Sequence, residues 1–110
     1  MRMAKNDLQG TLDLLVLKTL SQQGALHGYG IVLHIQRASD DLLNVEEGSL
    51  YPALHRMEQN GWVAAAWGVT ETNRKAKFYK LTPAGKKHLQ AVEKDFEHLV
   101  QGVRAILRYA

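Results

Sequence analysis

The chain has 110 residues, of which 45% are hydrophobic, and its 14 Lys and Arg against 11 Asp and Glu give a formal net charge of +3. These values fit one globular domain with a modest core, and the absence of cysteine excludes disulfide frameworks, thiolate zinc sites and cysteine nucleophiles. No apolar run of about 18 residues occurs, so we expect a soluble, cytoplasmic protein that does not span a membrane.

The first predicted helix covers residues 8–21. Its apolar residues recur at a spacing that lines one helix face, at Leu8, Leu12, Leu15, Val16 and Leu20. Leu14 and Leu17 lie off this face. A helix that is apolar on more than one side is either central in the fold or shared between its own core and a partner. Gly24 is expected to end it.

A second helix is predicted within "HGYGIVLHIQRAS", residues 27–39, followed by a loop at "DDLLNV". The third helix is expected to begin between Gly48 and Leu50 and to end at Asn60 and Gly61, where a left-handed cap residue is usual. With that start, Pro52 would lie in the first turn, where its missing N–H is harmless.

The third helix has two distinct faces when its residues are placed about 100° apart. Leu50, Ala53, Leu54 and Met57 share one face and are expected in the core. The opposite face holds hydrogen-bonding groups and no carboxylate, and it consists of Ser49, Pro52, His55, Arg56 and Gln59, with Tyr51 at its border. Hydroxyl, imidazole, guanidinium and amide groups bind phosphates and base edges, so this face is a predicted DNA contact. The alternative is an ordinary solvent-exposed helix surface.

Two short strands follow at residues 62–67 and 77–81, joined by a long polar loop at residues 68–76, and they predict a two-stranded hairpin. The window of residues 72–92 contains no Asp or Glu but six bases: Arg74, Lys75, Lys77, Lys80, Lys86 and Lys87. Such a cluster attracts polyanions, although a merely solvated basic surface is the alternative.

The last helix is predicted to start with Thr82 as its cap and Pro83 as its first residue. Its apolar residues then alternate in steps of three and four, at Leu89, Val92, Phe96, Leu99, Val103 and Ile106. This heptad pattern favours packing along another long helix, as in a dimer. A long helix that lies on its own domain is the alternative.

The order of three helices, a hairpin and a terminal helix predicts a mostly α winged helix-turn-helix fold with a small β-hairpin. Residues 1–81 would form the DNA-binding part and residues 82–110 a long C-terminal dimerisation helix. No metalloprotease motif, phosphate loop or dinucleotide fingerprint occurs, so we expect no enzyme, metal site or cofactor. His27 and His34 could share a face, but a capping or partly buried histidine is the commoner role.

Three stretches, "GSLYPALHRMEQNGWV", "RKAKFYKLTPAGKKHL" and "LHGYGI", resemble the PadR-type transcriptional regulators over most of residues 8–90. The resemblance implies a homodimeric DNA-binding repressor of bacterial type, in which the first and last helices form the dimer. It therefore adds Leu12 and Leu15 to the predicted interface, and it places Arg74, Lys75 and Lys77 on or beside the wing. A symmetric dimer should bind a double-stranded operator with two-fold-related half-sites.

Regulators of this family often respond to small aromatic or drug-like molecules at the dimer interface, so an effector of this kind is an implied partner. Here the terminal helix offers only Phe96 and Tyr109 as aromatic residues and lacks tryptophan. The rival function is a dimeric protein-interaction adaptor that keeps the winged fold without specific DNA binding. Salt dependence of DNA binding separates the two functions.

Overall fold

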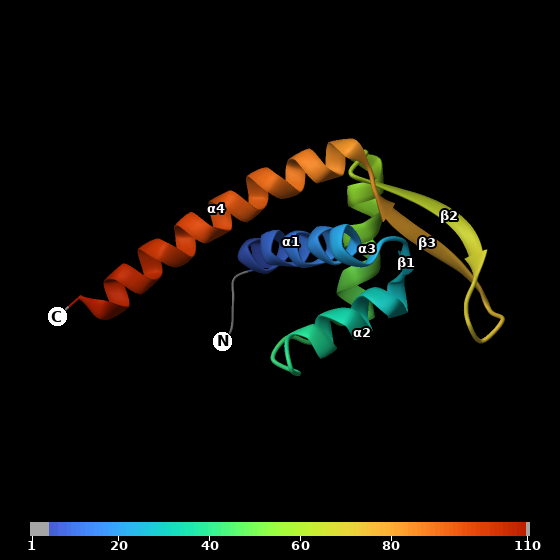
Figure 1. Cartoon of the computed structure of the whole chain (residues 1–110), viewed down its shortest axis with the longest axis horizontal. Helices are drawn as coiled ribbons and strands as arrows, with labels where there is room; N and C mark the ends of the chain where they lie inside the picture. Colours follow the sequence, from blue (N-terminus) through green and yellow to red (C-terminus); the bar gives the residue numbers. More distant parts are fainter. Residues whose placement is uncertain (1–4, 110) are drawn as a thin grey trace.

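The computed structural model describes the backbone of residues 5–109 and the side chains of residues 10–109. Its elements, in chain order, are α1 (Lys5–Gln23), β1 (Leu26–His27), α2 (Gly28–Ala38), α3 (Glu47–Gln59), β2 (Val63–Val69), β3 (Lys75–Leu81) and α4 (Pro83–Arg108). Figure 1 shows α1 at the centre, the β2–β3 hairpin projecting at one end and α4 extending from the other. The mostly α winged-helix fold with a long C-terminal helix is therefore confirmed.

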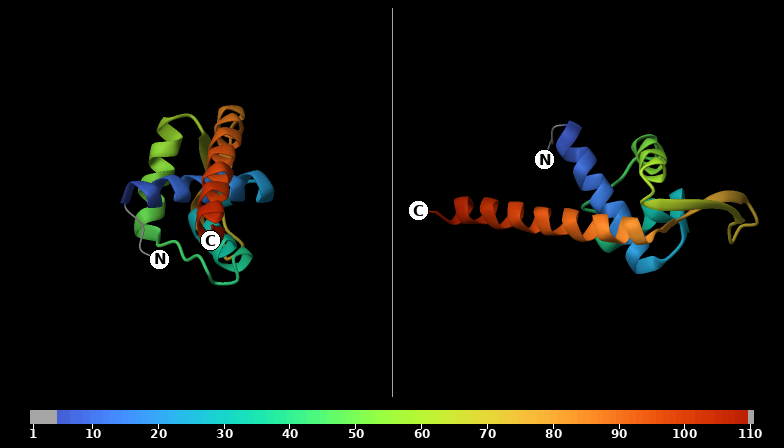
Figure 2. Two further views of the ribbon diagram at one scale, coloured as in Figure 1. Left: turned by 90° about the vertical axis from the view of Figure 1, so that its left-hand side faces the viewer. Right: turned by 90° about the horizontal axis from the view of Figure 1, so that it is seen from above.

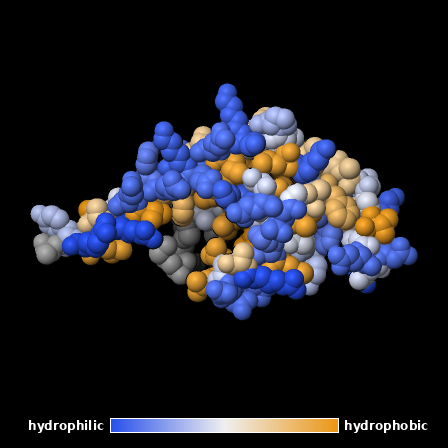
Figure 3. Space-filling model, viewed as in Figure 1, coloured by the Kyte–Doolittle hydropathy of each residue, from blue (hydrophilic) through white to orange (hydrophobic). Residues whose placement is uncertain are grey.

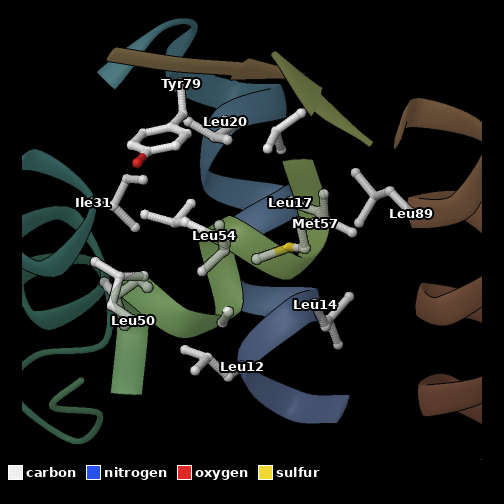
Figure 4. Close-up of a cluster of buried hydrophobic side chains, with 14 residues drawn as sticks. Leu12, Leu14, Leu17, Leu20, Ile31, Leu50, Leu54, Met57, Tyr79 and Leu89 are labelled. Carbon is white, nitrogen blue, oxygen red and sulfur yellow. The ribbon is translucent and has the colours of Figure 1, made fainter. Parts of the chain in front are cut away.

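Helix α1 is the central element, because it contacts α2, α3, α4 and β3. Its residues Val16 and Leu17 are fully buried, and Leu14, which lies off the predicted stripe, is buried too. Figure 4 shows side chains from all four helices and from β3 meeting in one cluster. Of the two alternatives for a helix that is apolar on more than one side, the structure shows the central position, whereas the side chain of Leu8 lies outside the described part.

The sheet has three antiparallel strands in the order β1-β3-β2, and not the two that were predicted. Residues Leu26 and His27 pair with Tyr79 and Phe78 of β3. A strand of two residues shows no alternation of apolar and polar residues, so the sequence pattern could not reveal it.

The hairpin of β2 and β3, which we call the wing, is longer than predicted and its loop is shorter. The strands pair from Val63 opposite Leu81 to Val69 opposite Lys75. A compact turn connects them, because the Thr70 N–H donates to the Arg74 carbonyl (2.8 Å) and Asn73 adopts a left-handed φ of 62°. The polar composition of the loop had suggested a flexible connection, but its threonines and asparagine build the turn itself.

Helix α3 begins at Glu47, earlier than predicted, so the explanation given for Pro52 is wrong. The N–H groups of Ser49 and Leu50 both bond to the Glu46 carbonyl at 3.0 Å, which already closes the first turn before the proline. Pro52 therefore lies inside the helix and removes a backbone bond to Gly48. Gly48 is exposed, so solvent can reach the region of its unpaired carbonyl.

Candidate nucleic-acid interface

The core face and the outer face of α3 are arranged as the sequence predicted. The core face is buried, and its members Leu50, Leu54 and Met57 have no exposed surface. Four residues predicted to contact DNA are exposed on the outer face: Ser49, Pro52, His55 and Gln59. Their contact with DNA stays a prediction.

Tyr51, the residue at the border of the two faces, braces the start of α2. A Cβ on Gly28 would lie 2.7 Å from the Tyr51 hydroxyl oxygen and 2.8 Å from a ring carbon, so only glycine allows the ring to lie this close. Burial raises the pKa of the Tyr51 phenol above its usual value, and the charge of Glu47 and the nearby Tyr79 add to the shift. Gly28 of the "GYG" motif and Tyr51 of the "LYP" motif therefore lie against each other.

Arg56 faces α1 and is bound to Asp13. Its two terminal nitrogens donate to the two carboxylate oxygens, at 2.6 Å and 2.9 Å. The hydrogen bonds that Arg56 donates to Asp13 raise the pKa of the guanidinium above its usual range, while partial burial acts in the opposite direction. Arg56, which was predicted to contact DNA, is therefore bound by a carboxylate that the sequence pattern did not identify.

The basic residues of the wing differ in their surroundings. Lys77 bonds to Glu58 of α3 at 3.2 Å, so it joins the wing to the recognition helix candidate. Lys75 is exposed, and its ammonium lies 5.5 Å from the ring centre of Trp67, a cation–π distance. Arg74 is exposed at the turn. Trp67 itself is 67% exposed, which is unusual for the largest apolar side chain.

The wing is fixed to the helical body on its other face. Phe78 meets the His27 ring edge to face, with centroids 5.3 Å apart, and a Cβ on Gly68 would lie 2.8 Å from the Phe78 ring. His27 also caps α2, because its Nδ1 accepts the Gly30 N–H at 3.1 Å. The commoner of the two roles considered for His27 is therefore confirmed.

Helix α4 is anchored at its start and unsupported at its end. The Thr82 hydroxyl donates to the Gly61 carbonyl (2.6 Å) and accepts the Gly85 N–H (3.0 Å), while Trp62 stacks on His88 with centroids 3.6 Å apart. From residue 101 onward every described side chain is exposed. Figure 2 shows this C-terminal end of α4 extending beyond the rest of the chain.

The apolar stripe of α4 changes from buried to exposed along the helix. Leu89 is buried and Val92 packs against the core, whereas Phe96, Leu99, Val103 and Ile106 are between 39% and 76% exposed. In α1, Leu12 is buried by its own chain and Leu15 is only partly exposed. Figure 3 shows apolar patches among hydrophilic side chains along the α4 arm. Leu12 and Leu89 therefore offer little surface to a partner.

The described residues provide no cluster of three or more histidine, aspartate or glutamate side chains able to hold a metal ion. Within the same part of the chain, no helix combines the length and the hydropathy that crossing a membrane requires.

Comparisons with known proteins agree with this geometry. The model of the transcriptional regulator PadR-like family matches residues 16–91. A transcriptional regulator of Mycobacterium tuberculosis is 31% identical over 84 residues, which cover 76% of this chain and 64% of that protein. Among solved structures, a transcriptional regulator from Clostridium thermocellum superposes with a TM-score of 0.83 at 26% identity, covering 97% of this chain and all of that one. A PadR family regulator from Eggerthella lenta gives 0.75 at 30% identity, covering 96% and 89%.

The sequence did not reveal two residues that lie against predicted DNA-contacting residues. Asp13 binds Arg56, and the ring of Trp67 lies near the Lys75 ammonium. A lone acid inside the apolar run "TLDLLVL" could have been a signal, because a buried carboxylate needs a cationic partner. The exposed tryptophan gave no such signal, because its position in a strand also suits a core. With the winged-helix fold, the exposed face of α3 and the family match together, the chain belongs to the PadR-like family of transcriptional regulators, which are DNA-binding regulators and not enzymes.

Proposed function

We propose that this protein is a homodimeric repressor that binds a two-fold-related operator, with α3 in the major groove and the wing on the backbone or minor groove. One observation carries the proposal: α3 presents Pro52, His55 and Gln59 to solvent beside a wing that exposes Arg74 and Lys75. This arrangement suits double-stranded DNA. An α-helix fits the major groove, where polar side chains can bond to base edges, and the neighbouring cations can bind phosphates.

The proposed division of labour follows the chain. Residues 1–81 bind DNA, and residues 82–110 form the dimerisation helix. On α3, Ser49, His55 and Gln59 would bond to bases or phosphates, while Pro52 shapes the exposed surface. Half-sites of such a dimer should be spaced by about 34–36 Å or a multiple of it. Acting on the chromosome would place the protein in the cytoplasm.

The wing would contribute Trp67 as well as its bases. Trp67 and Lys75 lie on the same face of the hairpin, because Trp67 pairs with Lys77 and Lys75 with Val69, two residues further along β2. The Lys75 ammonium stays near the indole ring instead of bonding to an acid. An exposed aromatic ring beside a cation can contact sugar and base edges while the cation neutralises a phosphate.

DNA binding can be tested by fluorescence anisotropy with a labelled duplex from upstream of the protein's own gene, over a series of salt concentrations. Lys75→Ala should reduce the slope of log affinity against log salt by about 0.9, the value for one lost phosphate contact. Lys94→Ala removes an equally exposed cation from α4 and serves as the matched control. Binding that is absent, or independent of salt, would favour the adaptor function instead. Repression is tested separately with a reporter gene behind the bound duplex.

The proposed dimer uses the exposed part of the α4 stripe together with Leu15 of α1. Phe96→Glu would place a charge among Leu99, Val103 and their counterparts in the second copy, so the variant should be monomeric by light scattering at concentrations where the parent is dimeric. Lys94→Glu is the control, since Lys94 lies on the opposite side of the same turn. A Phe96→Glu variant that stays dimeric would contradict this interface.

We place the implied aromatic effector in a groove of about 380 Å³ between α1, α2 and α4. Its lining is mostly apolar and includes Leu14, Leu15, Ile35, Leu43 and Phe96. A planar aromatic compound that binds there should raise the melting temperature, because it binds the native state only. Leu43→Trp, at the 41% exposed rim, should fill the groove and abolish the shift. A compound whose shift survives this substitution binds elsewhere.

A further inference from the structure

Asp13 is an anomaly in the core of this protein. It is 8% exposed, it lies between Leu12 and Leu14 in the central helix α1, and it is the only Asp, Glu, Lys, Arg or His among the buried described residues. A carboxylate that is removed from water strongly destabilises a fold unless a cation and hydrogen bonds compensate for the lost hydration. Arg56 of α3 supplies both.

The pair is bidentate, with Arg56 Nη2 donating to Asp13 Oδ1 at 2.6 Å and Nη1 donating to Oδ2 at 2.9 Å. Two parallel bonds between planar groups fix direction as well as distance, which a lysine in the same place could not do. The contact therefore restricts the rotation of α3 about its own axis and its sliding along α1. Its two residues are 43 positions apart, so it is a tertiary constraint between two helices.

The same geometry argues against a direct DNA contact by Arg56, which the sequence placed on the predicted DNA-contacting face as a reader of a base or a holder of a phosphate. An arginine that reads guanine uses the fork of its two terminal nitrogens towards O6 and N7. In this protein both nitrogens of that fork donate to Asp13. Reading a base would require Arg56 to leave a buried carboxylate without its cation, and that arrangement is strongly disfavoured.

The pair also lies between the predicted DNA-contacting face of α3 and the predicted dimerisation helix α4. Asp13 belongs to α1, which packs on α4 and is linked to it by Lys18 and Glu93 at 3.0 Å. Arg56 is followed by Met57 of the core and preceded by His55 of the exposed face. A displacement of α1 against α4 would therefore reach the outer face of α3 through this contact.

We propose that the Asp13–Arg56 pair is a positioning device that sets the orientation of α3 from α1, so that Arg56 acts on DNA binding through helix orientation and not by touching DNA. This inference rests on the proposed DNA-binding function. Its special consequence concerns Asp13: removal of an acid near a DNA-binding surface ordinarily strengthens binding, but here it should weaken it.

The test compares operator affinity and its salt slope for Asp13→Asn, Arg56→Lys and the parent protein, with Lys75→Ala as the reference for a lost phosphate contact. We expect Asp13→Asn and Arg56→Lys each to weaken operator binding roughly 3- to 30-fold, the range for mutations that alter coupling between sites. Their salt slopes should equal that of the parent, because no phosphate contact is lost. Binding by Asp13→Asn that equals or exceeds the parent's would overturn the proposal.

Exchanging the partners adds an independent arm. In the double variant Asp13→Arg/Arg56→Asp the pair is reversed, so binding should recover relative to either single change if Arg56 positions α3. A direct contact would instead be replaced by a repelling carboxylate, and the double variant would bind worse than Arg56→Lys. Arg56→Met, which keeps length without charge, gives the remaining contrast: a salt slope lowered by about 0.9 would mean that Arg56 holds a phosphate.

A readout without DNA separates this proposal from the proposed function. Hydrogen exchange at the α3 amides should accelerate in Asp13→Asn and in Arg56→Lys, while exchange in the β2–β3 hairpin stays as in the parent. If the parent binds no duplex but α3 exchange accelerates, the proposed function fails and the positioning contact stands. If α3 exchange is unchanged in both variants, the positioning contact is refuted.

Discussion

Gly85→Ala tests the junction where α4 leaves the wing. A Cβ at this position would overlap the Trp62 carbonyl oxygen, and it would lie 2.8 Å from the Trp62 carbonyl carbon and 2.9 Å from Leu81 Cδ1. Carbon atoms in contact are normally separated by at least about 3.5 Å, so the helix start would have to move by more than about 0.7 Å, and further still to clear the carbonyl oxygen. The obstructing group is backbone, which cannot rotate away as a side chain can.

This displacement would also strain the hydrogen bonds that hold the start of α4 in place. The Thr82 N–H donates to the Trp62 carbonyl at 3.1 Å, and the Thr82 hydroxyl donates to the Gly61 carbonyl at 2.6 Å. Overpacking typically costs about 1–3 kcal/mol, and each weakened hydrogen bond adds roughly 0.5–1.5 kcal/mol. Alanine has a higher helix propensity than glycine, which offsets about 1 kcal/mol of this loss. We therefore expect Gly85→Ala to lower the free energy of unfolding by about 3 kcal/mol.

The assay is thermal unfolding followed by circular dichroism, at one protomer concentration because dimer stability depends on concentration. A loss of this size should lower the melting temperature by roughly 10–20 °C. Gly10→Ala is the matched control, since a Cβ there meets nothing within 4 Å, and it should raise stability by up to about 1 kcal/mol. A Gly85→Ala protein as stable as the Gly10→Ala protein would refute the close contact.

Three further outcomes are expected. Gly28→Ala should destabilise the protein because its Cβ would lie 2.7 Å from the Tyr51 hydroxyl, and Tyr51→Ala should remove most of that loss; additive effects in a double-mutant cycle would contradict the contact. Because the pKa of Tyr51 is raised above 10.0, the neutral phenol is favoured in the native state, so stability should fall as the pH rises above 10.0; urea titrations should show a shallower fall in Tyr51→Phe. In a Trp62→Phe background, operator DNA should quench the remaining Trp67 fluorescence, and an unchanged spectrum with DNA bound would remove Trp67 from the interface.

Several features were predictable because they depend on residues close in sequence. The two faces of α3 follow from the 3.6-residue period, and Leu50, Ala53, Leu54 and Met57 are buried as expected. The Thr82 cap and the proline after it mark the start of α4 by local chemistry alone. The family motifs are local as well, which is why a resemblance read from short stretches agrees with the family match over residues 16–91.

One error arose where distant residues decide the structure, and another where the start of a helix was placed too late. Strand β1 exists because β3 offers a free edge to Leu26 and His27, not because those two residues favour a strand. Helix α3 starts early because the Glu46 carbonyl accepts two N–H groups, which placed Pro52 in the second turn and not the first. Arg56 was predicted on the outer face of α3, and only the packing of α3 against α1 brings its guanidinium to Asp13.

The sequence by itself determined the order of the elements, the apolar and polar faces of α3 and α4, and the family, because helix periodicity, caps and motifs are encoded within a few neighbouring residues. Only the tertiary structure decided which of the residues predicted to contact DNA or a second copy are exposed in the folded chain. Packing α1 against α3 brings Asp13 to Arg56, packing the wing against α3 brings Glu58 to Lys77, and both pairs join residues too distant for any local pattern to connect. A long-range charge pair is set by the geometry of packed helices, and that geometry is a property of the whole chain.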